Sequence, residues 1–384
     1  MLEINEGSHA VAEIVSLCRP QVVSAYPITP QTHIVEALAE MVADCKLDAE
    51  YITVENELSA LSACIGASAT GSRVYSATTS QGLALMYEAC FNAAGMRLPI
   101  IMTIANRAMG APLSIWNDQQ DSISLRDSGW LQFYAEDNQE ATDLHVVAYK
   151  VAEDNSVLLP AMVCFDGFIL SHTYEPIDML SQEDVDKFLP KFSPYEKLDA
   201  ADPISFGMYA TPEYYHEFRY EIDNAVKRAK DVIREAGKEF GTMFGRDYSG
   251  LIEEYRMEDA ETAIVAMGSV CGTIKDAIDE MRASGKKVGL VRIRVFRPFP
   301  AEDITKALSK VKRVAVLDKN ISLGAKGATA LEIKDAMYGK TTPVLNYIIG
   351  LGGRDVRKRD IAAIVALTEK GEGDMFYGIR KEVL

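Results

Sequence analysis

Short apolar segments alternate with longer segments of helical periodicity along the first half of the chain. Pro99 to Ala105 is apolar at almost every position, and Asn138 to Ala152 carries apolar side chains at helical spacing. Nearly continuous apolar runs are typical of strands in a parallel sheet that helices cover on both faces. The alternation therefore predicts an α/β fold with a parallel sheet. The other expected strands are Val22 to Tyr26, Glu50 to Val54, Val74 to Thr78 and Ala161 to Phe165, and the other expected helices are His33 to Val42, Glu57 to Thr70 and Gly82 to Ala94.

A second α/β pattern follows an irregular stretch. Prolines interrupt residues 173–212, and Glu213 to Ala236 then has the pattern of a long amphipathic helix. We expect a first domain over residues 1–195, a connector with the long helix over 196–257, and a smaller α/β domain over 258–384. The expected strands of the last part are Thr262 to Met267, Lys287 to Val295, Arg313 to Leu317 and Val344 to Ile349, and its helices are Thr273 to Ala283, one from Ala301, and Gly324 to Met337, with a turn at Phe296 to Pro300.

Composition narrows the class of protein. The chain has 384 residues, of which 48% are hydrophobic and 25% charged, as is typical of a soluble globular protein. Its net charge of -16 argues against non-specific binding to nucleic acid or to anionic membranes. No apolar run reaches the length of a membrane span, and the acidic N-terminus lacks the features of a signal peptide. The six cysteines form no C-x-x-C pair, so we expect a cytoplasmic protein with core cysteines and no metal or iron–sulfur site of its own.

Polar side chains follow each of the five expected strands in the first domain. Parallel sheets bind ligands beyond the carboxyl ends of their strands, so these side chains would share one rim. A ligand site is expected at that rim. The strand ends carry Thr29, then Glu55-Asn56-Glu57, then Thr79-Ser80-Gln81-Gly82, then Asn106-Arg107, and finally Asp166-Gly167-Phe168.

Each of these residues also has an ordinary structural interpretation. Thr29 before Pro30 predicts a helix N-cap, although a helix N-terminus at this point would also favour an anion. Glu57 is an acid in a first helical turn, where the helix dipole favours it. Arg107 could pair with a surface carboxylate, but it starts next to a fully apolar strand, and its guanidinium suits a substrate carboxylate.

Two further segments leave two interpretations open. The long loop from Ala111 to Ser122 is either a cover for the site or a contact with another subunit. Gly268-Ser269-Val270-Cys271-Gly272 is either a phosphate-binding turn or a tight turn between a strand and a helix.

The motif Tyr26-Pro27-Ile28-Thr29-Pro30 resembles the signature loop of the 2-oxoacid:ferredoxin oxidoreductases, in particular the alpha subunits of pyruvate:ferredoxin oxidoreductases. Glu55-Asn56-Glu57 with Gly66-Ala67-Ser68, Arg107 after the central strand, and the segment Trp116 to Asp121 match the same family. The resemblance covers essentially the whole chain. It implies a domain that binds the pyrimidine half of thiamine diphosphate, followed by a domain like the C-terminal domain of transketolase.

The resemblance also implies roles for individual residues. Glu57 would activate the cofactor, and Thr29 and Arg107 would hold the carboxylate of the substrate. The positions implied to contact the cofactor are Pro27, Ile28, Glu57, Ser80, Gln81 and Gly82. The implied reaction is the oxidative decarboxylation of pyruvate to acetyl-CoA and CO2, with coenzyme A as co-substrate and electrons passed to ferredoxin.

One expected motif is missing. Thiamine enzymes bind the diphosphate and its metal through a Gly-Asp-Gly motif with a downstream asparagine, and Phe165-Asp166-Gly167-Phe168 lacks the first glycine. We therefore expect this chain to supply half of a site. By resemblance, a beta chain would bring the diphosphate pocket, Mg2+ and iron–sulfur clusters, with gamma and delta chains or a fusion completing the complex.

The sequence leaves three alternatives to this substrate and function open. The substrate could be 2-oxoisovalerate, 2-oxoglutarate or oxalate, although the neutral hydroxyl of Thr29 favours a monoacid. The chain could belong to a transferase of the transketolase type, but such enzymes carry the missing diphosphate motif. It could also be a non-catalytic assembly subunit, against which the presence of Thr29, Glu57 and Arg107 argues.

Overall fold

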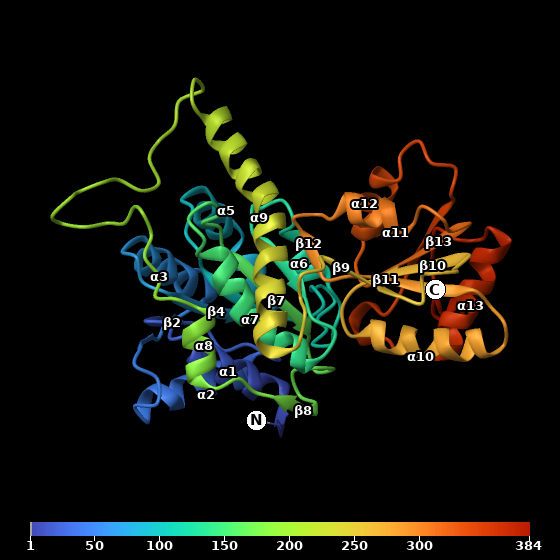
Figure 1. The fold of residues 1–384 in the computed structure, drawn as a ribbon, viewed down its shortest axis with the longest axis horizontal. Coiled ribbons are helices and arrows are strands. Elements are labelled where there is room, and N and C mark those ends of the chain that lie inside the picture. Colours follow the sequence, from blue (N-terminus) through green and yellow to red (C-terminus); the bar gives the residue numbers. More distant parts are fainter. Residues whose placement is uncertain (1) are drawn as a thin grey trace.

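A computed structural model describes residues 2–384. Its first large unit is built around a seven-stranded sheet (Figure 1). The strand order is β12-β6-β7-β5-β4-β2-β3, and every neighbouring pair is parallel except β12 and β6. The central strand β5 is buried at every position. The bounds are β2 (Val22–Ser24), β3 (Glu50–Ile52), β4 (Val74–Thr78), β5 (Ile101–Asn106), β6 (Leu131–Tyr134), β7 (Ala161–Asp166) and β12 (Val295–Arg297).

Helices cover this sheet and fill the connections between its strands. Helix α7 is buried at nearly all positions, and the long helix α9 packs against it. A small antiparallel pair, β1 (Leu2–Glu6) with β8 (Tyr174–Asp178), lies beside the main sheet. The helices are α1 (Gly7–Leu17), α2 (Thr32–Ala43), α3 (Glu57–Ala69), α4 (Ser80–Leu85), α5 (Tyr87–Gly95), α6 (Gln120–Ser124), α7 (Asn138–Ala152), α8 (Gln182–Phe188) and α9 (Tyr215–Phe244).

The second unit is a six-stranded sheet in the order β15-β14-β13-β10-β11-β9. Only its edge strand β9 runs antiparallel to its neighbour. The bounds are β9 (Ile252–Tyr255), β10 (Thr262–Ala266), β11 (Val288–Ile293), β13 (Arg313–Asp318), β14 (Val344–Ile348) and β15 (Met375–Phe376) for strands, and α10 (Val270–Ala283), α11 (Ala301–Ala307), α12 (Ala328–Ala336) and α13 (Lys358–Lys370) for helices, with short 3-10 turns at Leu351–Gly353 and Lys381–Val383.

The α/β fold with a parallel sheet, expected from the sequence, is confirmed. The predicted bounds of β4 and α7 agree with the structure, whereas the predicted helix from Gly82 is two helices, α4 and α5. The predicted N-cap at Thr29 is wrong, because α2 begins at Thr32 with Gln31 before it. The predicted turn at Phe296 to Pro300 is partly wrong, because β12 pairs with β6 and extends the first sheet.

Figure 1 shows the two units side by side, with β12 and the start of β9 between them. The segment between α8 and α9 extends far from the body of the first unit. Among residues 2–384, no helix combines the length and the apolar character that crossing a membrane requires.

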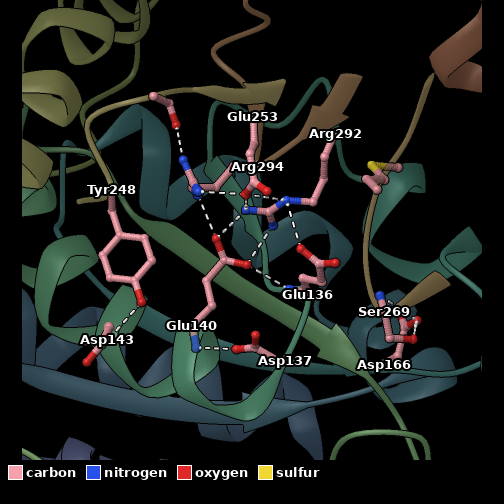
Figure 2. A network of polar contacts seen from close by, with 12 residues as sticks. Glu136, Asp137, Glu140, Asp143, Asp166, Tyr248, Glu253, Ser269, Arg292 and Arg294 are labelled. Atoms are coloured by element: carbon pink, nitrogen blue, oxygen red, sulfur yellow. Dashed lines mark hydrogen bonds and ion pairs between the residues drawn. The ribbon is translucent and has the colours of Figure 1, made fainter. Parts of the chain in front are cut away.

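A buried cluster of charged side chains joins the two units (Figure 2). Arg292 of β11 and the neighbouring Arg294 each place a guanidinium nitrogen 2.6 Å from a carboxylate oxygen of Glu140 on α7. Glu253 of β9 lies 2.7 Å from Arg292. Burial raises the pKa of Glu140, but the attraction of the two arginines outweighs this effect and lowers the pKa to about 2. The units are therefore connected by ion pairs, of which the two to Glu140 are buried and those to Glu253 are partly exposed.

Candidate active site

The loop from Tyr26 to Gln31 follows β2 at the carboxyl end of the first sheet. The buried side chain of Gln31 donates hydrogen bonds to the carbonyl oxygens of Tyr26, at 2.8 Å, and Ala77, at 3.2 Å. The main-chain N–H of Gln31 donates to the carbonyl of Ile28 at 2.9 Å, which closes a turn. Gln31 therefore fixes the loop against β4 and leaves Thr29 exposed at the rim.

Arg107, directly after β5, is brought against this loop. Its Nη1 donates to the main-chain carbonyl of Thr29 at 2.8 Å, and its Nε donates to the carbonyl of Ser114 at 3.1 Å. The residue is 6% exposed, and burial lowers the pKa of Arg107, although nearby Asp121 opposes this effect. An arginine stays protonated in such a site. The structure therefore places one fixed positive charge beside the exposed Thr29.

Glu57 is the first residue of α3, where the side chain of Asn56 accepts a hydrogen bond from the N–H of Ser59 at 2.9 Å. Glu57 is only 7% exposed, yet its carboxylate makes no hydrogen bond or ion pair with any of residues 2–384. Its two oxygens are not fully buried, so they keep contact with solvent at the rim. The carboxylate is therefore suited to accept a hydrogen bond from a ligand.

Gly82 lies directly against that carboxylate. A Cβ atom at Gly82 would lie 2.6 Å from Oε1 of Glu57 and 2.5 Å from Oγ1 of Thr78, closer than any side chain could tolerate. The hydroxyl of Thr78 is itself buried without a hydrogen-bond partner in the described chain. Two unsatisfied polar groups thus adjoin Gly82, where only the absence of a side chain leaves room.

Asp121 hydrogen-bonds to the residues at the ends of β4 and β5. In the sequence it stood out only as part of the segment Trp116 to Asp121, which matches the family. Its Oδ2 accepts the main-chain N–H groups of Ser80 and Arg107, both at 3.0 Å. Its Oδ1 accepts from the side chain of Asn106 at 2.8 Å. Burial raises the pKa of Asp121 against the opposing effect of these hydrogen bonds. No local sequence pattern indicates this role, because the four residues meet only through the fold.

The other predicted contact positions differ in accessibility. Ser80 is fully buried, with its hydroxyl 2.6 Å from the carbonyl oxygen of Ala108. Pro27 is exposed, and Ile28 and Gln81 are partly exposed. The structure brings these residues to the same rim as Glu57, and Ser80 already has its partners within the chain.

Asp166, at the end of β7, turns toward the second unit instead. Nζ of Lys319 lies 2.9 Å from its carboxylate. Oγ of Ser269 lies 2.5 Å from the same carboxylate, as Figure 2 shows. Burial raises the pKa of Asp166, but Lys319 and Ser269 outweigh this effect and lower it. The turn from Gly268 to Gly272 thus serves as a contact between the units.

The long loop after Arg107 divides into two parts. Leu113 and Trp116 are 73% and 54% exposed, respectively. Further along, Asn117 and Gln119 are buried against the second unit, where the N–H of Gln119 donates to Lys319 O at 2.8 Å. The second part is therefore a contact within the chain, which neither sequence-based interpretation had included.

Solved structures share this two-unit α/β fold. A 2-oxoglutarate:ferredoxin oxidoreductase from Magnetococcus marinus matches with a TM-score of 0.72 at 20% identity, over 96% of this chain and 65% of that chain. A split-gene transketolase, described as an inactive beta4 tetramer, matches with a TM-score of 0.55 at 11% identity, over 95% of this chain and 96% of that chain. At these identities the likeness concerns the fold.

Sequence comparison narrows this fold to a family. Residues 14–238 match the family model "Pyruvate flavodoxin/ferredoxin oxidoreductase, thiamine diP-bdg", and residues 260–361 match "Pyruvate:ferredoxin oxidoreductase core domain II". The pyruvate synthase subunit PorA of Methanothermobacter thermautotrophicus is 54% identical over 100% of this chain and 99% of its own length. The ketoisovalerate oxidoreductase subunit VorA of Pyrococcus horikoshii is 52% identical over 94% of this chain and 92% of its own length.

The chain belongs to the pyruvate:ferredoxin oxidoreductase family. The resemblance inferred from the signature loop is confirmed, as are the expected oxidoreductase class and the thiamine diphosphate-binding domain. The roles of Thr29, Glu57 and Arg107 stay predictions.

Proposed function

We propose that this chain is the alpha subunit of a pyruvate synthase. The reaction is the reversible oxidative decarboxylation of pyruvate to acetyl-CoA and CO2, with electrons passed to ferredoxin. The observation that carries the proposal is the carboxylate of Glu57, which has no partner in the described chain and lies beside Gly82, on the same rim as Arg107 and Thr29. Relatives that cover the whole chain at about 54% identity and are named pyruvate synthase subunits support the choice of substrate.

The residues at the rim fit the pyrimidine half of thiamine diphosphate. Glu57 could accept a hydrogen bond from a protonated ring nitrogen, and Gly82 leaves the room that the Glu57 carboxylate needs at this position. The bound cofactor supplies a nucleophilic carbon and a sink for the electrons of the substrate. With the cofactor bound, Glu57 would hold a proton on the ring nitrogen and would thereby favour the tautomer that can act as a base.

Arg107 and Thr29 would orient the substrate. Nε and Nη1 of Arg107 are held by main-chain carbonyls, whereas Nη2 makes no hydrogen bond within residues 2–384. Nη2 can therefore donate to a carboxylate oxygen, and the hydroxyl of Thr29 can donate to the other oxygen. One cation and one neutral hydroxyl suit pyruvate, which carries a single negative charge, better than they suit a dicarboxylate with two negative charges.

Partner chains complete the site in this proposal. Asp166 is held by Lys319 and Ser269, so it is not free to bind Mg2+. Apolar side chains remain exposed around the rim, as expected of an interface; they include Leu58, Leu85, Tyr87, Leu113 and Trp116. We infer that a beta chain supplies the diphosphate pocket, Mg2+ and the clusters, that gamma and delta chains complete the complex, and that coenzyme A and ferredoxin are its further substrates.

An anaerobic assay of the complex that co-purifies with this chain tests the proposal. Reduction of a viologen dye with coenzyme A would be compared for pyruvate, 2-oxoisovalerate, 2-oxoglutarate and oxalate. Pyruvate should be strongly preferred. A preference for 2-oxoisovalerate, the substrate named for the 52% identical relative, would replace pyruvate in the proposal. No reduction by a complex with cofactor and intact clusters would contradict the proposed function.

A further inference from the structure

Three side chains that can ligate a metal ion meet where α1 and α2 begin. Glu6 precedes α1, His9 lies in its first turn, and His33 is the second residue of α2. One ligating atom from each lies within 4.8 Å of those of the other two. Within residues 2–384, this is the one group of three or more His, Cys, Asp or Glu side chains with such a geometry.

Local structure accounts for the cluster. Glu6 is the last residue of β1 and the extended residue that precedes α1, and His9 lies in the first turn of that helix. Helix α1 packs against α2, which brings in His33, and Figure 1 shows both helices near the N-terminus. Glu6 is 6% exposed, whereas His9 is exposed and His33 is partly exposed. A buried carboxylate therefore anchors a group that is open to solvent on its histidine side.

The cluster is more than a hydrogen-bonded pair. Nδ1 of His33 lies 2.6 Å from Oε1 of Glu6, an arrangement that needs only two residues. The ring of His9 lies beside that pair, with its centroid 5.8 Å from that of His33. His9 makes no hydrogen bond or ion pair with another of residues 2–384, so both of its ring nitrogens remain available.

We propose that Glu6, His9 and His33 bind a divalent transition-metal ion, with Zn2+ as the preferred ion. Two imidazoles and one carboxylate are ligands that Zn2+ accepts, with water in the fourth position. Zinc bonds of about 2.1 Å in a tetrahedron separate the ligand atoms by about 3.4 Å. The metal therefore replaces the Glu6–His33 hydrogen bond and draws His9 inward by side-chain rotation.

The charge of Glu6 is essential to this site. Two helices begin here, and the positive ends of their dipoles disfavour a cation. The Glu6 carboxylate supplies the compensating negative charge. Glu6→Gln, which keeps the shape of the side chain, therefore removes binding.

A metal ion at this site would stabilise the fold near α1 and α2 and would take no part in the reaction itself. His33 follows the loop that carries Thr29, so the metal fixes the beginning of α2 behind this loop. On its other side the ring of His33 lies 4.7 Å from that of His172, measured between centroids. His172 in turn contacts Phe168, and Phe168 contacts Trp116 of the rim.

Metal titration of the untagged full-length chain tests the proposal. The chain would first be freed of metal with a chelator, and a Cys45→Ser background would remove the exposed thiol, which could also bind zinc. Co2+ serves as the spectroscopic probe and Zn2+ as the calorimetric one. We expect one equivalent of either ion to bind and Zn2+ to raise the midpoint of thermal unfolding.

Variants locate the bound ion. Glu6→Gln and His9→Ala should each lose the stoichiometric Co2+ spectrum and the rise of the midpoint. His216→Ala changes an exposed histidine of α9 and should bind as the parent does. His9→Ala decides the question if Glu6→Gln does not fold, because His9 is exposed and makes no hydrogen bond. Absence of stoichiometric uptake by the parent chain, or equal uptake by the His9 variant, would overturn the proposal.

Discussion

At the scale of single residues, the candidate site depends on groups that the chain leaves without partners. The carboxylate of Glu57 makes no hydrogen bond within residues 2–384, the hydroxyl of Thr78 is buried without a partner, and Nη2 of Arg107 is uncommitted. Because Glu57 and Arg107 lie on one rim and Thr78 adjoins the Glu57 carboxylate, we propose that these groups face a ligand. The rest of the rim is tied together internally by Asp121 and Gln31.

Arg107→Lys should weaken substrate binding more than turnover. A lysine cannot reach the carbonyls of Thr29 and Ser114 and also bind a carboxylate in the planar geometry of a guanidinium. Loss of one charge-assisted hydrogen bond of about 1.5–3 kcal/mol predicts a KM for pyruvate raised about 10- to 100-fold. Steady-state kinetics of the complex measure this effect. Arg359→Lys, at an exposed position of α13, is the matched control, and an unchanged KM in Arg107→Lys would refute the role.

Gly82→Ala should abolish activity by steric conflict. The added methyl group would meet the Glu57 carboxylate at 2.6 Å, so the carboxylate or α4 must move. We expect a loss of thiamine diphosphate occupancy together with activity, measured on the purified complex. Gly66→Ala is the control, since no atom lies within 4 Å of a Cβ at Gly66 in α3. Full occupancy and activity in the Gly82 variant would mean that the cofactor does not depend on the position of the Glu57 carboxylate.

At the residue scale, the sequence indicated the location of residues that follow strands but not of residues that only the fold brings together. The signature loop, Glu57 and Arg107 lie on one rim because each follows a strand, and the roles that the family resemblance implies for them stay predictions. Thr29 was wrongly predicted to be an N-cap, because the turn closed by Gln31 and the contact with Arg107 delay the helix. Asp121 as organiser and the Glu6, His9 and His33 cluster involve no local pattern.

At the scale of elements, hydrophobic periodicity predicted the buried parts well. The bounds of β4 and α7 agree because the burial of both reaches their ends. The strand β6 was missed, since Trp130 to Ala135 contains a buried Gln132 that breaks the apolar pattern. The pairs β1–β8 and β12–β6 join segments far apart in sequence, which periodicity does not report.

The ion-pair cluster around Glu140 predicts a specific loss of stability in acid. The pKa of Glu140 is about 2 in the folded chain, below its ordinary value of 4.5, so its contribution is present above pH 4.5 and is lost as the pH falls toward 2. Linkage puts that contribution at about 3 kcal/mol. Glu140→Gln should therefore be less stable at pH 7 and should show a flatter dependence of the unfolding free energy between pH 4.5 and 2.

Urea unfolding of the full chain at several pH values measures that dependence. Asp223→Asn removes an exposed ion pair with Lys227 and should change stability by less than about 1 kcal/mol. If Glu140→Gln followed the pH dependence of the parent chain, the buried cluster would not be the source of acid sensitivity.

At the scale of the whole molecule, this chain carries Glu57, Arg107 and Thr29 on one rim, to which we assign catalytic roles as a proposal, and it lacks the diphosphate motif. The domain boundaries at residues 195 and 257 stay a prediction. The strand β9 lies within the expected connector and pairs with the second sheet. The apolar side chains exposed around the rim are consistent with a partner chain over the site.

The central claim is that Glu57 activates thiamine diphosphate in the assembled enzyme. Its most direct test is the rate at which the C2 proton of the bound thiazolium ring exchanges with deuterium, measured by NMR after an acid quench. In a complex with Glu57→Gln that still binds the cofactor, this rate should fall by about 100-fold or more, since a general acid–base contribution of that size is lost. Glu235→Gln, at an exposed position of α9, should exchange as the parent does. An unchanged rate in the Glu57 variant would contradict the account.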